Sequence, residues 1–172
     1  AKDNLPKRGI APGLMISMAE IEVDLETGKY EILDYVGVAD CGTIIHPQGL
    51  SQQINGGGVW GFGMAATERH VYDPQIALPA NLGMYQAKLP TILDVPAEMP
   101  NGAVDIADPY NPVGGRGVGE PSQGSAVAAI TSAIADALDG HLFNRVPVTP
   151  DMIVNHATGA EQESKLLALN TF

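Results

Sequence analysis

A glycine-rich stretch that ends in a carboxylate is the part of this sequence best suited to chemistry. Residues 114–121 read GGRGVGEP, so Glu120 directly follows a run that contains four glycines. Glycines allow a main chain to approach a bound molecule without interference from side chains. The partial positive charge at the start of a following helix favours an ionised carboxylate. Glu120 is therefore a candidate proton acceptor at the mouth of a site, and a plain helix cap is the alternative.

The other reactive side chains form no arrangement that indicates a second chemistry. The four histidines lack His-x-x-x-His spacing, no Gly-Lys-Ser/Thr follows the glycine loop, and no Gly-x-Ser-x-Gly elbow is present. His46 precedes a glycine-rich segment and is interpreted as a loop cap or a hydrogen-bonding residue. Cys41 is the only cysteine, and a lone cysteine is more often packed than reactive. We therefore predict no metal ion held by side chains of this chain.

Two amphipathic segments are expected to form the helices that position these residues. In the first, residues 48–67, five of the eight positions from 56 to 63 are glycine. Each glycine inside a helix costs about 1 kcal/mol relative to alanine, so either tight packing or a ligand close to the backbone is needed to explain them. The second helix opens at Glu120 and Pro121 and stops near Gly140. The apolar stripes are Leu50, Ile54, Gly57, Gly61 and Met64 in the first helix, and Val127, Ile130, Ile134 and Leu138 in the second.

Alternating apolar and polar residues predict a β-hairpin before the first helix. Its strands are expected at 14–24 and 30–39, joined by a turn at 25–29 in which Gly28 supplies a positive φ. The weaker expectations are short strands at 70–72, 95–99 and 103–107, an extended loop at 73–91, a short helix at 152–156, and a last helical turn or docking arm at 161–172. Together these elements predict an α+β fold, in which a hairpin-containing sheet accompanies two main helices.

Composition excludes several classes of protein. The 172 residues fit one domain or part of a larger one, and the net charge of −11 disfavours nucleic acids and anionic membranes as partners. No run of 18 apolar residues exists, so no transmembrane span is expected. Only 17% of the residues are charged, while glycine and proline are abundant, which suggests a surface covered by other protein. The first residue is Ala1 rather than methionine, so we expect a processed chain or a fragment.

Several separated motifs, in order, resemble one known family. Residues 40–68 and 111–138 are similar to the C-terminal part of the molybdenum-binding subunit of the xanthine dehydrogenase/aldehyde oxidase family. The hairpin before them resembles that family's strand pair, and RVPVTPDMI at 145–153 resembles its usual ending. The resemblance covers about 13–155. It implies that residues 1–172 are the C-terminal part of a molybdopterin-binding catalytic domain.

The resemblance also implies roles for individual residues. Glu120 matches the family's active-site glutamate beside molybdenum, and Gly119 lies where the backbone passes close to the metal. Gln53 matches a glutamine that contacts the pyranopterin, and Gly56 and Gly57 match the small residues next to it. This sequence has His46-Pro47 where the family often has Asn-Pro, and Gln52-Gln53 where it often has Gly-Gln. The role of His46 is therefore open, as is the local path of the backbone.

The implied activity is oxidative hydroxylation of an aldehyde or N-heteroaromatic substrate, with water as the oxygen source and Glu120 as general base. The implied cofactor is a molybdenum-pyranopterin, as molybdopterin or its cytosine dinucleotide form. The implied partners are an upstream molybdenum-binding chain, an iron–sulfur subunit that carries [2Fe-2S] clusters, and a flavin subunit that carries FAD. The alternatives are a non-catalytic interaction or maturation module and a carbon-monoxide dehydrogenase-type subunit. We expect a cytoplasmic protein, with the periplasm as the alternative.

Overall fold

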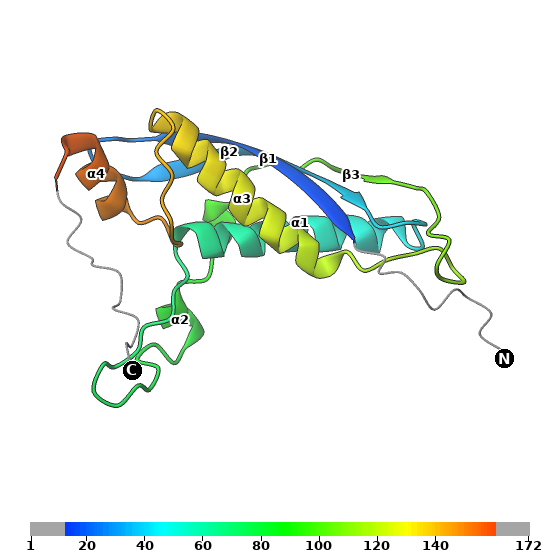
Figure 1. Ribbon diagram of the computed structural model, residues 1–172, viewed down its shortest axis with the longest axis horizontal. Helices are drawn as coiled ribbons and strands as arrows, with labels where there is room; N and C mark the ends of the chain where they lie inside the picture. The colour runs from blue at the N-terminus through cyan, green and yellow to red at the C-terminus, as the bar shows by residue number, and fades with distance from the viewer. Residues whose placement is uncertain (1–12, 161–172) are drawn as a thin grey trace.

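Residues 13–160 of the computed structural model form a three-stranded sheet covered on one face by two long helices (Figure 1). The α+β prediction with two main helices is therefore confirmed. The expectations for the N-terminus and for 161–172 lie outside the described residues. In chain order the elements are β1 (Leu14–Val23), β2 (Tyr30–Asp40), α1 (Pro47–Ala66), α2 (Met84–Ala87), a 3₁₀ turn (Ile92–Asp94), β3 (Asn101–Val104), α3 (Gly119–Ala137) and α4 (Pro150–Thr158).

The hairpin forms as its alternating pattern predicts. β1 and β2 pair antiparallel from Leu14 opposite Asp40 to Val23 opposite Tyr30. Gly28 in the connecting turn has φ +70°, and a side chain there would collide with the carbonyl group of Pro150. The turn therefore needs glycine both for its backbone conformation and for its contact with the start of α4.

The weaker strand predictions are partly wrong. The strand expected at 103–107 is β3, four residues long at Asn101–Val104, and it pairs parallel with the end of β2. No strand forms at 95–99, because Pro96 inside this segment and Pro100 directly after it cannot donate to a ladder. The strand expected at 70–72 is only an isolated bridge between Tyr72 and Pro79. The loop expected at 73–91 contains the one-turn helix α2.

Helices α1 and α3 cross against the inner face of the sheet, and the glycines of α1 allow this close approach (Figure 1). A Cβ at Gly61 would lie 2.5 Å from the Cβ of Ala126 on α3. A Cβ at Gly58 would lie 2.9 Å from the ring of Tyr35 on β2. Packing therefore explains these two glycines. The buried core between the layers includes Ile32, Tyr35, Phe62, Ala65, Ala126, Ile130, Ile134, Leu138, Val148 and Ile153.

A hydroxyl network joins the sheet to α3 inside this core. The Oγ of Ser17 lies 2.8 Å from the hydroxyl of Tyr35 and 2.8 Å from the Oγ of Ser125. Burial raises the pKa of Tyr35, whose side chain is inaccessible to solvent. Because buried polar groups need partners, the network fixes the register of α3 against β1.

The segment between α1 and the 3₁₀ turn, residues 68–91, extends away from the two layers (Figure 1). Its apolar side chains are unusually exposed, with Leu82 at 83% and Tyr85 at 88%. Contiguous exposed apolar side chains are typical of surfaces that other protein covers. Within residues 13–160, no helix combines the length and the apolar character needed to cross a bilayer.

Candidate functional site

The first turns of α1 lie beside the glycine loop, which leads directly into α3, and a cavity of about 370 Å³ opens between them. Three segments form its walls: the loop after β2, the N-terminal half of α1, and the glycine loop before α3. The lining residues are Cys41, Thr43, Ile44, Ile45, His46, Gly49, Leu50, Gln53, Gly115, Arg116 and Val118. Of the five site residues predicted from the sequence, Gln53 lines this cavity, while Gly119 directly follows the lining residue Val118.

Main-chain hydrogen bonds hold the glycine loop against the end of β2. The carbonyl oxygen of Gly114 accepts from the N–H groups of Thr43 and Asp108, both at 2.8 Å. The N–H of Arg116 donates to the carbonyl oxygen of Cys41 at 2.6 Å. Gly42 and Gly114 have φ values of +73° and +71°, and a side chain at Gly42 would collide with the Gly114 carbonyl. Glycine is therefore required at both positions for this close approach.

Arg116 adds an ionic link that sequence reasoning missed. Its Nε lies 3.2 Å from Oδ2 of Asp108, and its Nη1 lies 3.3 Å from Oδ2 of Asp40 at the end of β2. Asp108 is almost fully buried, and removing the partner of a buried charge is strongly destabilising. The available signal was that Arg116 is the only lysine or arginine between Lys88 and Arg145 in a strongly acidic chain.

The structure brings Gln53, Gly57 and Gly119 together. A Cβ at Gly119 would lie 3.0 Å from Oε1 of Gln53, so the start of α3 passes directly beside this side chain. A Cβ at Gly57 would collide with the Cβ of Ser122 and would lie 3.1 Å from the carbonyl oxygen of Gly119. Gly57 is therefore buried by packing, while the Gln53 side chain remains exposed at the cavity.

Gly56 and Glu120 lie at the edge of this group rather than inside it. Gly56 is exposed, and no atom lies within 4 Å of a Cβ placed there. Glu120 is exposed in the first turn of α3, and among residues 13–160 its carboxylate has no hydrogen-bond or salt-bridge partner. Val118 is the N-cap and makes no side-chain capping bond. Glu120 therefore does not act as a side-chain cap of α3, contrary to the plain alternative.

His46 and Cys41 take the roles expected of them in the loop. His46 is the N-cap of α1, and its Nδ1 accepts a hydrogen bond from the N–H of Gly49 at 2.7 Å. Cys41 is buried, and desolvation raises the pKa of its thiol, which keeps it protonated and unreactive at neutral pH. Across residues 13–160, no three His, Cys, Asp or Glu side chains gather as a metal site.

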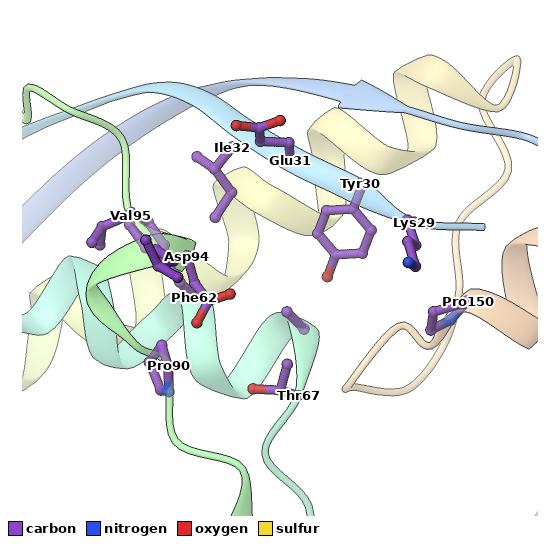
Figure 2. A pocket seen from close by; sticks show the side chains of 12 residues that line it. Lys29, Tyr30, Glu31, Ile32, Phe62, Thr67, Pro90, Asp94, Val95 and Pro150 are labelled. Atoms are coloured by element: carbon purple, nitrogen blue, oxygen red, sulfur yellow. The ribbon is translucent and has the colours of Figure 1, made fainter. Parts of the chain in front are cut away.

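A second pocket, of about 280 Å³, lies at the other end of α1 (Figure 2). Phe62, Pro90 and Val95 give it apolar walls, and Tyr30 points from β2 toward the C-terminal turn of the helix. The hydroxyl of Tyr30 donates to the carbonyl oxygen of Ala65 at 3.2 Å, and burial raises its pKa. None of the sequence-based site residues lines this pocket.

Comparison with known proteins identifies the family. The family model described as a molybdopterin cofactor-binding domain matches residues 6–96, which include Gln53, Gly56 and Gly57. The chain belongs to the molybdopterin cofactor-binding domain family. The resemblance to the molybdenum-binding subunits of the xanthine dehydrogenase/aldehyde oxidase family is thereby confirmed.

Relatives of this molybdopterin-binding domain are subunits of larger enzymes. The gamma subunit of the 6-hydroxypseudooxynicotine dehydrogenase complex of Paenarthrobacter nicotinovorans is 32% identical over 87% of this chain, which spans 19% of that protein. The xanthine dehydrogenase molybdenum-binding subunit of Escherichia coli O157:H7 is 30% identical over 81% of this chain, or 18% of that protein. The chain therefore spans about one-fifth of the length of these relatives.

Solved structures show the same fold. Quinoline 2-oxidoreductase of Pseudomonas putida 86 superposes with a TM-score of 0.72 at 28% identity, over 82% of this chain and 18% of that one. The aldehyde oxidoreductase of Desulfovibrio gigas superposes with a TM-score of 0.70 at 29% identity, over 83% of this chain and 15% of that one. The two-layer arrangement thus recurs as part of two oxidoreductases whose chains are much longer.

Proposed function

We propose that residues 1–172 are the C-terminal part of the catalytic domain of a molybdenum hydroxylase. The reaction proposed is oxidative hydroxylation of an aldehyde or an N-heteroaromatic ring, with water as the oxygen source. The observation that carries the proposal is the meeting of Gln53 with Gly119, two positions 66 residues apart in the sequence, beside a cavity of about 370 Å³. Because the chain belongs to the molybdopterin-binding family, we infer that the cofactor binds where these two residues meet.

The residues at this point fit a molybdenum-pyranopterin. The side-chain amide of Gln53 can donate to and accept from the polar edge of a pterin. The missing side chain at Gly119 leaves backbone accessible next to that amide, and the open space over Gly56 leaves the neighbouring helix surface uncovered. The cofactor, as molybdopterin or its cytosine dinucleotide form, supplies the two-electron redox chemistry when bound. This chain forms one wall of its site.

Glu120 is the proposed general base. Its carboxylate is exposed, unpartnered among the described residues, and directly adjacent to Gly119. It lies in the first turn of α3, where the exposed N–H groups of the helix favour a negative charge. In the proposed role it accepts the proton from the water-derived nucleophile as that oxygen attacks the electron-poor carbon of the substrate.

The proposed partners follow from the length of the chain relative to its relatives. We infer that the rest of a molybdenum-binding polypeptide encloses the substrate, and that an iron–sulfur subunit with [2Fe-2S] clusters and a flavin subunit with FAD carry electrons away. The exposed apolar side chains of residues 68–91 support contact with such partners. Native mass spectrometry of the purified material tests this: a free, active 18.0 kDa monomer with bound cofactor would contradict the proposal.

The decisive experiment replaces Glu120 in the assembled enzyme. Glu120→Gln keeps the size of the side chain but removes the base, so turnover should fall by a factor of about 100 to 10,000. Molybdenum and pterin contents, measured by elemental analysis and by fluorescence of the oxidised pterin, should stay unchanged. The matched control is Glu26→Gln, an exposed glutamate in the hairpin turn, which should leave turnover unaltered. Near-normal turnover of Glu120→Gln at equal molybdenum content would contradict the assignment.

A further inference from the structure

The outer face of the sheet, opposite to α1 and α3, carries two chemically different halves. Directly paired residues of β1 and β2 lie on the same face, so the register defines cross-strand pairs there. Ile16 pairs with Val38, and Met18 pairs with Val36, which makes the half nearer the glycine loop mainly apolar. At its end Leu14 pairs with Asp40, whose carboxylate is bound by Arg116. Toward the hairpin turn, Glu20 pairs with Asp34 and Glu22 pairs with Glu31, which makes the other half mainly acidic. A β-bulge separates these two pairs and leaves Leu33, 45% exposed, without a partner on β1. We call this surface the outer sheet face.

The apolar half is open to solvent. Leu14 is 60% exposed, Ile16 is 61% exposed and Met18 is 65% exposed, although all three lie on β1 and pair with β2. The two long helices occupy the opposite face, where Ser17 and Tyr35 point. No helix or strand among residues 13–160 covers these side chains. A contiguous aliphatic strip of this kind is typical of a protein–protein contact.

The acidic half has an unfavourable arrangement as it stands. Two carboxylates oppose each other directly in each of two pairs, one on either side of the β-bulge, and like charges directly opposite destabilise a sheet. None of the lysines and arginines in residues 13–160 forms a salt bridge with these four side chains. Within residues 13–160 one compensating contact is local, since Oδ1 of Asp34 accepts from the N–H of Tyr35 at 2.8 Å. A basic surface laid against the face would relieve this repulsion.

A second copy of this chain does not fit the outer sheet face. A two-fold axis would place the acidic half of one copy against either the acidic half or the apolar half of the other. The first arrangement doubles the repulsion, and the second buries carboxylates against aliphatic side chains without partners, which is costly. The net charge of −11 adds to the repulsion between copies. The occupant must instead present a patch of aliphatic side chains next to a patch of lysines and arginines.

We propose that the outer sheet face binds a surface of this kind from the remaining part of the same molybdenum-binding polypeptide. This inference rests on the proposed function, because it takes the chain to be one-fifth of a longer subunit, as in the relatives. The apolar strip provides the buried centre of the contact. The paired carboxylates provide charge complementarity, which selects the orientation and the partner.

Carboxylate labelling of the purified, assembled enzyme tests the proposal. Carbodiimide with glycine ethyl ester modifies accessible carboxylates, and peptide mass spectrometry reports each position in native enzyme and in enzyme unfolded in urea. Glu20, Glu22 and Asp34 should be modified at least about tenfold more slowly in the native enzyme, as expected for groups in a buried contact. Glu26, at the hairpin turn of the same chain, serves as the accessible reference. Modification of the three carboxylates at the rate of Glu26 would overturn the proposal.

Cross-linking identifies the occupant. Carbodiimide without added amine joins a carboxylate to a lysine in direct contact. A link from Glu22 to a lysine elsewhere in the same polypeptide supports the proposal, whereas a link to another subunit or to a second copy overturns it. The variant Glu22→Lys should lose the link and raise the labelling of Glu20 and Asp34, while Glu26→Lys should change neither. Molybdenum and pterin contents of the same sample distinguish failure of the contact from failure of the proposed function. Enzyme that contains the cofactor but has an accessible outer sheet face refutes only the contact. Enzyme that lacks the cofactor refutes the proposed function.

Discussion

The two ends of α1 differ in what holds them together. At the N-terminal end, backbone hydrogen bonds and the ion pairs of Arg116 fix the loops around the 370 Å³ cavity. At the C-terminal end, Phe62 and Tyr30 pack beside an apolar pocket of 280 Å³ (Figure 2). A 20-residue helix is about 30 Å long, so the two regions are separate parts of the molecule.

This difference indicates separate tasks for the two ends. Directional polar contacts and exposed main chain suit the recognition of a polar ring system, because they set the positions of donors and acceptors. Apolar packing suits stability, because burial is non-directional and scales with area. We therefore expect changes at the C-terminal end to alter stability alone, and changes at the N-terminal end to alter cofactor binding or turnover.

The largest effect on stability is expected at Phe62. Its ring is buried and meets Tyr35 edge to face at 4.9 Å between centroids. Phe62→Ala should lower the free energy of opening of α1 by about 3–5 kcal/mol, measured by hydrogen exchange of its amides in the assembled enzyme. Turnover per bound molybdenum should stay at the wild-type level. A strong loss of turnover per molybdenum would break the proposed separation of the two ends.

Arg116 should produce the next largest effect, at the opposite end. Arg116→Ala leaves the buried carboxylate of Asp108 without its cationic partner, which should cost about 3 kcal/mol. Hydrogen exchange at the N–H groups of Thr43 and Asp108, which both donate to Gly114, should accelerate, and molybdenum content should fall. Adding Asp108→Asn removes the unpaired charge and should restore part of the loss. Unchanged exchange in Arg116→Ala would show that the ion pairs do not hold the loop.

A smaller effect is expected from Tyr30→Phe. Removing the hydroxyl deletes the hydrogen bond to the carbonyl of Ala65, a loss of about 1 kcal/mol at neutral pH. Because burial raises the pKa of Tyr30, the folded state binds the phenolic proton more tightly than the unfolded state. The ionisation of Tyr30 therefore leaves the free energy of unfolding unchanged below about pH 10 and lowers it as the pH rises further. Above about pH 10 the free energy of unfolding of Tyr30→Phe should therefore fall less steeply with pH than that of the wild type. Part of the decline should remain, because Tyr35 also has a raised pKa. Equal slopes in the two proteins would contradict this assignment.

The smallest effect on stability, with a clear effect on the cofactor, is expected for Gln53→Ala. The side chain is exposed, so the free energy of opening should change by less than about 0.5 kcal/mol. Pterin content or turnover should nevertheless fall, because the amide is proposed to contact the pterin. Gln52→Ala is the matched control, since Gln52 is the neighbouring exposed glutamine of α1 and lines no part of the cavity. Equal pterin content and kinetics in both variants would remove Gln53 from the proposed site.

The hairpin and the long helices could be predicted because their signals are local. Alternation along β1, Gly28 in the turn and Pro47 at the start of α1 each act within a few residues. The strand at 95–99 was predicted wrongly because its apolar residues were given more weight than Pro96 within it and Pro100 after it, which lack the backbone N–H that a ladder needs. The isolated positive charge of Arg116 was visible in the sequence, but its pairing with Asp40 could not be predicted, since Asp40 lies 76 residues away.

The sequence by itself determined the family motifs, the α+β composition and the residues Gln53, Gly119 and Glu120 as candidates. The tertiary structure decided what each glycine does, since Gly61 packs against Ala126 while Gly56 faces open space. It also decided that Gln53 lies beside Gly119, that β3 pairs parallel with β2, and that one sheet face stays uncovered by residues 13–160. The physical reason is that helix periodicity and capping depend on neighbouring residues. Contacts between distant segments depend on how the layers pack and on closing long loops, which no local pattern records.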